Sequence, residues 1–173
     1  MNRVIAIGCS GSGKSTLARI LGAKTGLPIH HLDVLYWQSG WRPHPDEAAF
    51  QARVREISAQ EQWIIDGGFT TGNAEERFSR ADTVVLFDLP RLLCLWRVFK
   101  RFVTSVAKGR PDLPPGCPER VDFEFYRYIW NYRNTQFPKI LGNVDAHFKG
   151  RLIRIHSERD QAGFLGSIGL EQD

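Results

Sequence analysis

The sequence predicts an α/β fold: one domain over residues 1–173, built on a five-stranded parallel sheet with helices on both faces. Two observations support this prediction. Short apolar runs alternate with segments of helical periodicity along the chain, the pattern of parallel strands joined by crossover helices. The chain also has 173 residues, 42% of them hydrophobic, enough for one buried core of ordinary size.

The apolar runs place the five strands in order. We expect strands at residues 3–7, 28–32, 63–66, 83–89 and 152–156. The run at 83–89 is continuous, as expected for a strand that is buried on both faces. Asp33 follows the run at 28–32, Asp66 ends the run at 63–66, and a glycine-rich turn follows the first run. Ligands bind at the carboxyl ends of the strands in such sheets, so this edge is the expected site.

Helical spacing predicts the segments between the strands. We expect helices at 14–24, 45–60, 75–79, 91–107, 119–141 and 160–168, with a kink at Pro138. The large aromatic side chains Trp96, Phe123 and Trp130 are expected in the core. Residues 36–43 and 109–118 are rich in Pro, Gly or aromatic residues and are expected to be loops.

Cysteine usage and hydropathy indicate the compartment. The three cysteines, Cys9, Cys94 and Cys117, form no C-x-x-C pair and are odd in number, which favours free thiols in a reducing environment. The first residues lack the succession of a signal peptide. The apolar stretch 92–106 is interrupted by three basic residues, which argues against a membrane span. We therefore expect a cytoplasmic protein.

The glycine-rich turn carries the strongest motif. The run Gly8-Cys9-Ser10-Gly11-Ser12-Gly13-Lys14-Ser15 matches G-x-x-x-x-G-K-[ST], a loop whose backbone N–H groups and following helix cradle phosphates. We predict that it binds ATP with Mg²⁺. Lys14 should reach the β and γ phosphates, Ser15 should ligate the metal, and Thr16 should lie beside the α phosphate. The expected nucleotide contacts in the loop are Gly8, Ser10, Gly11, Ser12, Gly13, Lys14, Ser15 and Thr16. A tight turn without a ligand is the alternative.

Two carboxylates are the next candidates. Asp66 is the expected partner of a metal-bound water or of Ser15. Asp33 could accept the proton of a substrate hydroxyl or position the acceptor. The alternative for Asp66 is a helix-capping or turn aspartate, and the alternative for Asp33 is a turn aspartate. No second carboxylate follows Asp66 and no N-K-x-D motif is present, so the sequence argues against motor ATPases and GTPases.

Basic residues concentrate in one region. Six of them, and no acidic residue, lie between Arg91 and Arg110, although the net charge of the chain is only +4. Guanidinium groups stabilise the charge that develops during phosphoryl transfer. We expect a lid at about 108–118 between two basic helices. A solvated basic face or a nucleic-acid patch is the alternative.

Taken together, these motifs resemble the adenylate-kinase-like P-loop kinases and, more closely, the small bacterial family of DNA topology modulation proteins. The resemblance rests on residues 8–16, Leu32-Asp33 with Trp37 and Trp41, and the segments 63–67, 86–90, 110–120 and 130–132. It implies a P-loop NTPase fold with a helical lid insert. It also implies that four arginines contact ATP or the phosphates in transit: Arg97, Arg101, Arg127 and Arg133.

The expected function follows from these residues and the resemblance. We expect an ATP-dependent small-molecule kinase with Lys14, Asp33, Arg101 and Arg127 in catalysis, Arg97 and Arg133 on the nucleotide, and Ser15 and Asp66 on Mg²⁺. Tyr36 and Thr70 stand where related kinases place acceptor-binding arginines, which argues against a nucleoside monophosphate acceptor. A nucleic-acid-associated regulatory ATPase and a nucleotide-sensing switch are the alternatives.

Overall fold

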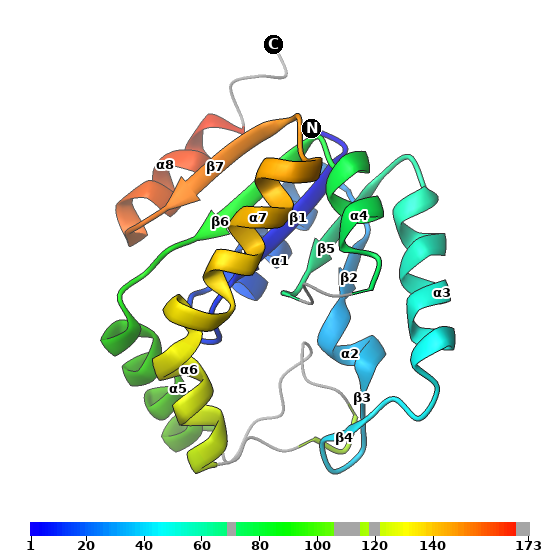
Figure 1. The fold of residues 1–173 in the computed structure, drawn as a ribbon. Helices are drawn as coiled ribbons and strands as arrows, with labels where there is room; N and C mark the ends of the chain where they lie inside the picture. The colour runs from blue at the N-terminus through cyan, green and yellow to red at the C-terminus, as the bar shows by residue number, and fades with distance from the viewer. Residues whose placement is uncertain (69–71, 106–114, 118–121, 169–173) are drawn as a thin grey trace.

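A five-stranded parallel sheet forms the centre of the molecule (Figure 1). The structure, a computed structural model, describes residues 1–68, 72–105, 115–117 and 122–168. The strands are β1 (Arg3–Gly8), β2 (Ile29–His31), β5 (Trp63–Asp66), β6 (Thr83–Phe87) and β7 (Arg151–Ile155), in the spatial order β2-β5-β1-β6-β7. The predicted α/β fold with this sheet is therefore confirmed.

Burial explains why the middle strands are continuous apolar runs. All residues of β5 and β6 are buried, and β1 is buried after its first residue. Ile5 of β1 pairs with Ile65 on one side and with Val84 on the other. Because parallel strands are covered on both faces, neither face of this sheet shows a polar alternation.

Helices cover both faces of the sheet. In Figure 1, α4 (Ala74–Arg80) and α7 (Phe137–His147) lie in front of it, whereas α1 (Lys14–Thr25) and α8 (Glu158–Ser167) lie behind. A further helix, α3 (Glu47–Ala59), lies beyond the β2 edge and is capped by Asp46, whose Oδ1 accepts a hydrogen bond from the N–H of Ala49 at 2.9 Å.

Two helices lie near the carboxyl ends of the strands. They are α5 (Arg91–Ser105) and α6 (Phe123–Thr135), which pack against each other. The expectation of one helix over 119–141 is wrong, because α6 ends at Thr135 and α7 begins at Phe137. Pro138 has no N–H to donate, and it is tolerated in the first turn of the new helix.

The segment after β2 differs from the prediction. The short helix α2 (Leu32–Tyr36) follows β2 directly, so Asp33 lies in the first turn of a helix and not in a turn after a strand. The predicted loop beyond it contains an antiparallel hairpin of β3 (Trp37–Gln38) and β4 (Arg42–Pro43). Its tip uses Gly40 and Trp41, both with positive φ.

Residues 115–117 hold this hairpin. The N–H of Gly40 donates to the carbonyl of Gly116 at 2.9 Å. The thiol of Cys117 donates to the carbonyl of Gln38 at 3.0 Å and accepts from the N–H of Trp41 at 3.4 Å. The thiol is therefore a structural hydrogen-bonding group, and Cys117 is buried.

Three aromatic residues expected in the core are exposed. Trp96 is 59% exposed, Phe123 81% and Trp130 45%. Helical spacing identifies an apolar stripe but not the element that covers it, and α5 and α6 turn other side chains towards the protein. Across the described residues, the structure has no helix long and apolar enough to cross a membrane.

Candidate active site

The loop between β1 and α1 requires glycine at three positions. At Gly8, a Cβ atom would lie 2.6 Å from the Cβ of Phe87. At Gly11, with φ +80°, it would lie 2.5 Å from the carbonyl oxygen of Cys94 in α5. Gly13 has φ +99° and is the N-cap of α1. The loop is thus tightly packed between β6 and α5, with the backbone shape of a phosphate cradle.

The N-terminus of α1 favours an anion. No side chain caps this helix, and its first turn carries no acidic residue. Lys14 and Ser15 are half-buried there, and Thr16 is exposed. Unpaired N–H groups and the helix dipole together bind phosphate oxygens at such a terminus. In the loop itself, Ser10 is half-buried and the buried hydroxyl of Ser12 has no hydrogen-bond partner among the described residues.

Asp66 lies beside this loop at the end of β5. The register pairs it with Ala6 of β1 on one side and with His31 of β2 on the other. The Nδ1 atom of His31 lies 2.7 Å from Oδ2 of Asp66. The other oxygen, Oδ1, is buried and has no partner in the described part of the chain. An orphaned carboxylate oxygen is costly, and a metal-bound water is a donor that would satisfy it.

Asp33 lies close enough to the same groups to interact with them electrostatically. Desolvation raises the pKa of the Asp33 carboxyl, and the charge of Asp66 raises it further. Lys14 and His31 oppose this shift, and the side chain of Trp37 donates a hydrogen bond to the carboxylate. The structure therefore brings Lys14, Asp33 and Asp66 together at the carboxyl edge of the sheet, as expected from the sequence.

Arg97 bridges the loop and α8. One guanidinium nitrogen donates to the carbonyl of Ser12 at 3.1 Å, and another lies 2.6 Å from Oε1 of Glu158. Arg101, one turn further along α5, is half-buried, and Arg127 is exposed on α6. Of the predicted nucleotide-binding arginines, Arg97 thus contacts the glycine loop directly.

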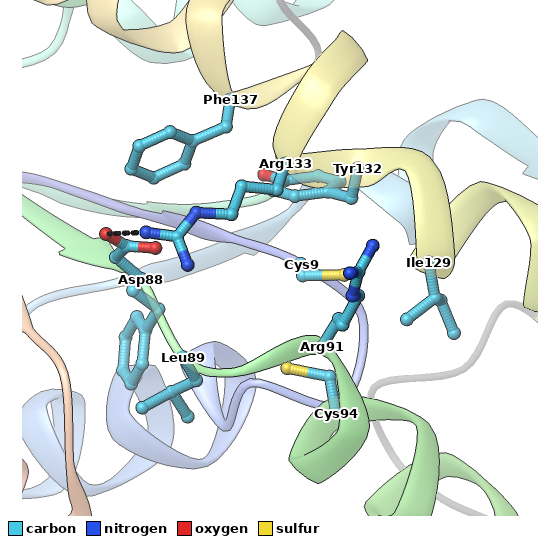
Figure 2. Close-up of a pocket in the computed structure, with 10 residues that line it drawn as sticks. Cys9, Asp88, Leu89, Arg91, Cys94, Ile129, Tyr132, Arg133 and Phe137 are labelled. Carbon is cyan, nitrogen blue, oxygen red and sulfur yellow. Dashed lines mark ion pairs between the residues drawn. The ribbon is translucent and has the colours of Figure 1, made fainter.

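Arg133 lines a pocket beside Cys9 of the glycine loop (Figure 2). Its side chain is 67% exposed, and one guanidinium nitrogen lies 3.6 Å from Oδ2 of Asp88, the residue after β6. Figure 2 shows the two side chains beside Cys9 of the loop, with Arg91 and Tyr132 also lining the pocket. The guanidinium of Arg91 stacks on the ring of Trp130 at 4.1 Å.

Several residues of the site were not predicted. They are His31, Asp88 and Glu158. Asp88 carried a usable signal, because it lies near the carboxyl end of an apolar run, as Asp66 does. The pairing of His31 with Asp66 depends on the register of β2 with β5, which leaves no local pattern.

The residues expected near the acceptor lie in different surroundings. Tyr36 packs edge-on against the rings of Trp37 and Phe50, each with centroids 5.0 Å away. Arg77 is fully buried in α4, away from any acceptor, and desolvation lowers its pKa to about 10. Thr70, the basic residues Lys108, Arg110 and Arg120, and all of the 108–118 lid except 115–117 lie outside the described residues.

The described residues hold no cluster of three or more histidine, cysteine, aspartate or glutamate side chains that could bind a metal alone. Magnesium bound to phosphates needs no such cluster, because phosphate oxygens and water supply most of its ligands. The hydroxyl of Ser15 and the free oxygen of Asp66 suit this mode of binding.

The α/β fold, with the sheet order β2-β5-β1-β6-β7, matches solved structures of P-loop kinases. No protein-family model and no curated protein sequence matches the chain. Shikimate kinase from Bacteroides thetaiotaomicron superposes with a TM-score of 0.57 at 15% identity, covering 98% of this chain and 97% of that one.

Two further structures share the fold. Shikimate kinase from Acinetobacter baumannii in complex with shikimate has a TM-score of 0.56 at 14% identity, covering 100% of this chain and 96% of that one. Gluconokinase from Sinorhizobium meliloti has a TM-score of 0.54 at 13% identity, with 99% and 98% covered. At these identities the likeness shows the fold alone.

Proposed function

We propose that the protein is an ATP-dependent kinase that transfers the γ-phosphate of Mg-ATP to a hydroxyl group of a small-molecule acceptor. The observation that carries this proposal is the convergence of Lys14, Asp33 and Asp66 on the glycine loop. The structural neighbours named above are kinases of small molecules, which agrees with the proposal.

The glycine loop would hold the phosphates through its backbone N–H groups, and the ammonium group of Lys14 would reach the β and γ phosphates. Thr16 would lie beside the α phosphate. Magnesium, held by Ser15 and through water by Asp66, would neutralise charge on the phosphates. Arg97 already contacts the loop and would bind the nucleotide from the α5 side. Arg101, Arg127 and Arg133 would contact the phosphates from α5 and α6.

Asp33 would act as the general base. The acceptor oxygen would form a bond to the γ phosphorus while the bond from that phosphorus to the β–γ bridging oxygen breaks, and the hydroxyl proton would pass to the Asp33 carboxylate. The raised pKa of Asp33 makes it a better base than a solvated aspartate. Trp37 would keep the carboxylate oriented through its hydrogen bond.

The acceptor would carry no phosphate group. A dianionic phosphate brought towards other phosphates needs guanidinium partners. Tyr36, at one of the positions where such an arginine is expected, packs among aromatic rings, and Arg77 is buried in α4. A neutral or singly anionic hydroxyl compound fits these surroundings better, so AMP should be a poor acceptor.

A nucleic-acid-associated regulatory ATPase is the rival proposal. The resemblance to DNA topology modulation proteins and the basic stretch from Arg91 favour it. Of the basic residues in α5, however, Arg97 faces the loop, Arg101 is half-buried and Arg91 stacks on Trp130. Salt-dependent DNA binding would support the rival.

The test is an assay of ADP release with Mg-ATP and a panel of hydroxyl metabolites, nucleosides and nucleoside monophosphates. We expect turnover to rise only with a hydroxyl acceptor and to fall at least about 100-fold in Lys14→Ala. Lys24→Ala, a change in the same helix, is the control. ATP hydrolysis that no acceptor stimulates, together with DNA binding, would overturn the kinase proposal. A monophosphate used with kcat/KM above roughly 10⁴ M⁻¹s⁻¹ would overturn the acceptor class alone.

A further inference from the structure

The outward side of α5 carries an exposed apolar stripe. Leu92 is 67% exposed, Trp96 59%, Phe99 48% and Val103 60%. Their separations of four, three and four residues place them on one narrow side of the helix. On the opposite side, Cys94 and Val98 are buried against the glycine loop. The helix is therefore apolar on two sides, and the described residues bury only one of them.

The stripe is large enough for a specific contact. The rings of Trp96 and Phe99 lie side by side, with centroids 6.3 Å apart. Trp130 of α6, 45% exposed and held beneath Arg91, adds a third exposed ring near the start of α5. Side chains of these sizes present several hundred Å² in total, close to the roughly 600 Å² that each partner buries in a small specific interface. A monomer rarely leaves such a patch in water.

The four residues of the stripe are spaced symmetrically about its midpoint. Leu92 and Val103 are equally far from its midpoint, and so are Trp96 and Phe99. A second copy of the helix, running antiparallel, would place Leu92 against Val103 of the partner subunit and Trp96 against Phe99 of the partner subunit. A contact in which the same residues serve both partners is what a two-fold axis produces.

The charges beside the stripe favour a second copy of this chain as its binding partner over an anionic surface. Arg97 is committed to Ser12 and Glu158, and the guanidinium of Arg91 lies on Trp130. Lys100 is exposed at the border of the stripe, from where its side chain reaches water. Nucleic acid or an anionic bilayer is bound by several solvent-facing cations, whereas the exposed cations of α5 are two, Lys100 and the Arg91 that lies on Trp130.

We propose that the stripe formed by Leu92, Trp96, Phe99 and Val103 is the contact between two copies of this chain, packed as an antiparallel α5–α5 pair about a two-fold axis. The proposal does not depend on the function proposed above. It also explains why a helix that supports Gly11 and carries Arg97 is apolar on its outward side.

The oligomeric state is the first test. We expect sedimentation to show a dimer at about 100 μM, a concentration that populates a contact with a Kd of roughly 10 μM. Trp96→Glu should give a folded monomer with an unchanged circular dichroism spectrum. The control is Ile20→Glu, at an exposed apolar residue of α1, which should leave the dimer intact. A wild-type monomer at this concentration, or a dimer that Trp96→Glu does not dissociate, would overturn the proposal.

Cysteine cross-linking tests the direction of the pair. Leu92→Cys and Val103→Cys proteins, mixed in equal amounts and oxidised, should form a cross-linked heterodimer. Each variant alone should not, because eleven residues of helix separate the two positions by roughly 16 Å. The wild type is the control, since Cys9, Cys94 and Cys117 are buried. Cross-linking within each single variant would show a parallel pair and overturn the proposed symmetry.

Discussion

The Nδ1 atom of His31 lies 2.7 Å from Oδ2 of Asp66, and the other oxygen of that carboxylate has no partner among the described residues. The parallel register of β2 and β5 makes the two residues neighbours. His31 therefore fixes the orientation of Asp66 and leaves one oxygen free. An imidazole that orients a carboxylate in this way influences how tightly the free oxygen holds its own ligand.

His31→Ala should weaken magnesium-linked nucleotide binding. We expect ATP affinity measured by calorimetry with Mg²⁺ to fall about 10-fold, because the Asp66 carboxylate loses its fixed orientation. ATP affinity in EDTA should change little. His31→Asn, whose amide can donate in the place of Nδ1, should restore most of the loss. His156→Ala, at an exposed histidine, is the control. An equal loss with and without Mg²⁺ would contradict a positioning role for His31.

Asp33→Asn should lower activity and raise stability. The pKa of Asp33 is raised by desolvation, so the folded state binds its proton more readily than the unfolded state. Stability consequently falls as the pH rises from the unfolded to the folded pKa, and above both values the charged carboxylate destabilises the fold. We expect turnover to fall about 100-fold or more while Tm at pH 7 rises. The gain in Tm should shrink as the pH falls through the raised pKa of Asp33 and be lost below about pH 4, where the aspartate of the unfolded chain is protonated as well. A lower Tm at pH 7 would show that the carboxylate is stabilised overall.

Gly11→Ala should be more destabilising than Gly26→Ala. Both residues have φ near +75° to +80°, but nothing lies within 4 Å of a Cβ at Gly26, whereas a Cβ at Gly11 would meet the Cys94 carbonyl. The backbone cost alone is about 1–2 kcal/mol, and displacing α5 should bring the Gly11 variant to about 3 kcal/mol or more. Urea unfolding measures both variants. Equal losses would mean that α5 moves away from the loop without cost.

Arg97→Ala should weaken ATP binding roughly 10-fold to 100-fold, the effect of losing one charge-assisted contact. Glu158→Gln should change it less than about threefold, because the Glu158 side chain is 80% exposed and its ion pair with Arg97 is screened by water. Fluorescence titration with an ATP analogue gives both affinities. Similar effects of the two substitutions would assign the role to the ion pair and not to Arg97 itself.

Much of the fold could be predicted because it is encoded locally. Buried parallel strands such as β6 are continuous apolar runs, and the glycine loop is contiguous in the sequence. The helix α2 was missed because five residues, Leu32–Tyr36, are too few to show helical periodicity. The predicted strand ended at Leu32 and the predicted loop began at Tyr36. The break between α6 and α7 was missed because proline also kinks helices without ending them.

The parts of the site that could not be predicted are non-local. Lys14, Asp33 and Asp66 could be placed together because each follows a strand or the glycine loop at the same edge. The contacts of His31 with Asp66 and of Arg97 with Glu158 join residues 35 and 61 positions apart. The exposure of Trp96 could not be read from its spacing either, because both sides of α5 are apolar.

Cys117 gives the protein an internal chemical reporter. Cys117 is 4% exposed, and its thiol donates a hydrogen bond to the carbonyl of Gln38 and accepts one from the N–H of Trp41 in the hairpin. An alkylating reagent can reach the sulfur only when the hairpin separates from residues 115–117. The thiol of Cys9 is buried, and its hydrogen bond with Cys94 raises its pKa, which keeps it unreactive. The rate at which Cys117 is alkylated, followed by peptide mapping, therefore measures how often the hairpin separates from residues 115–117, and no cysteine has to be introduced.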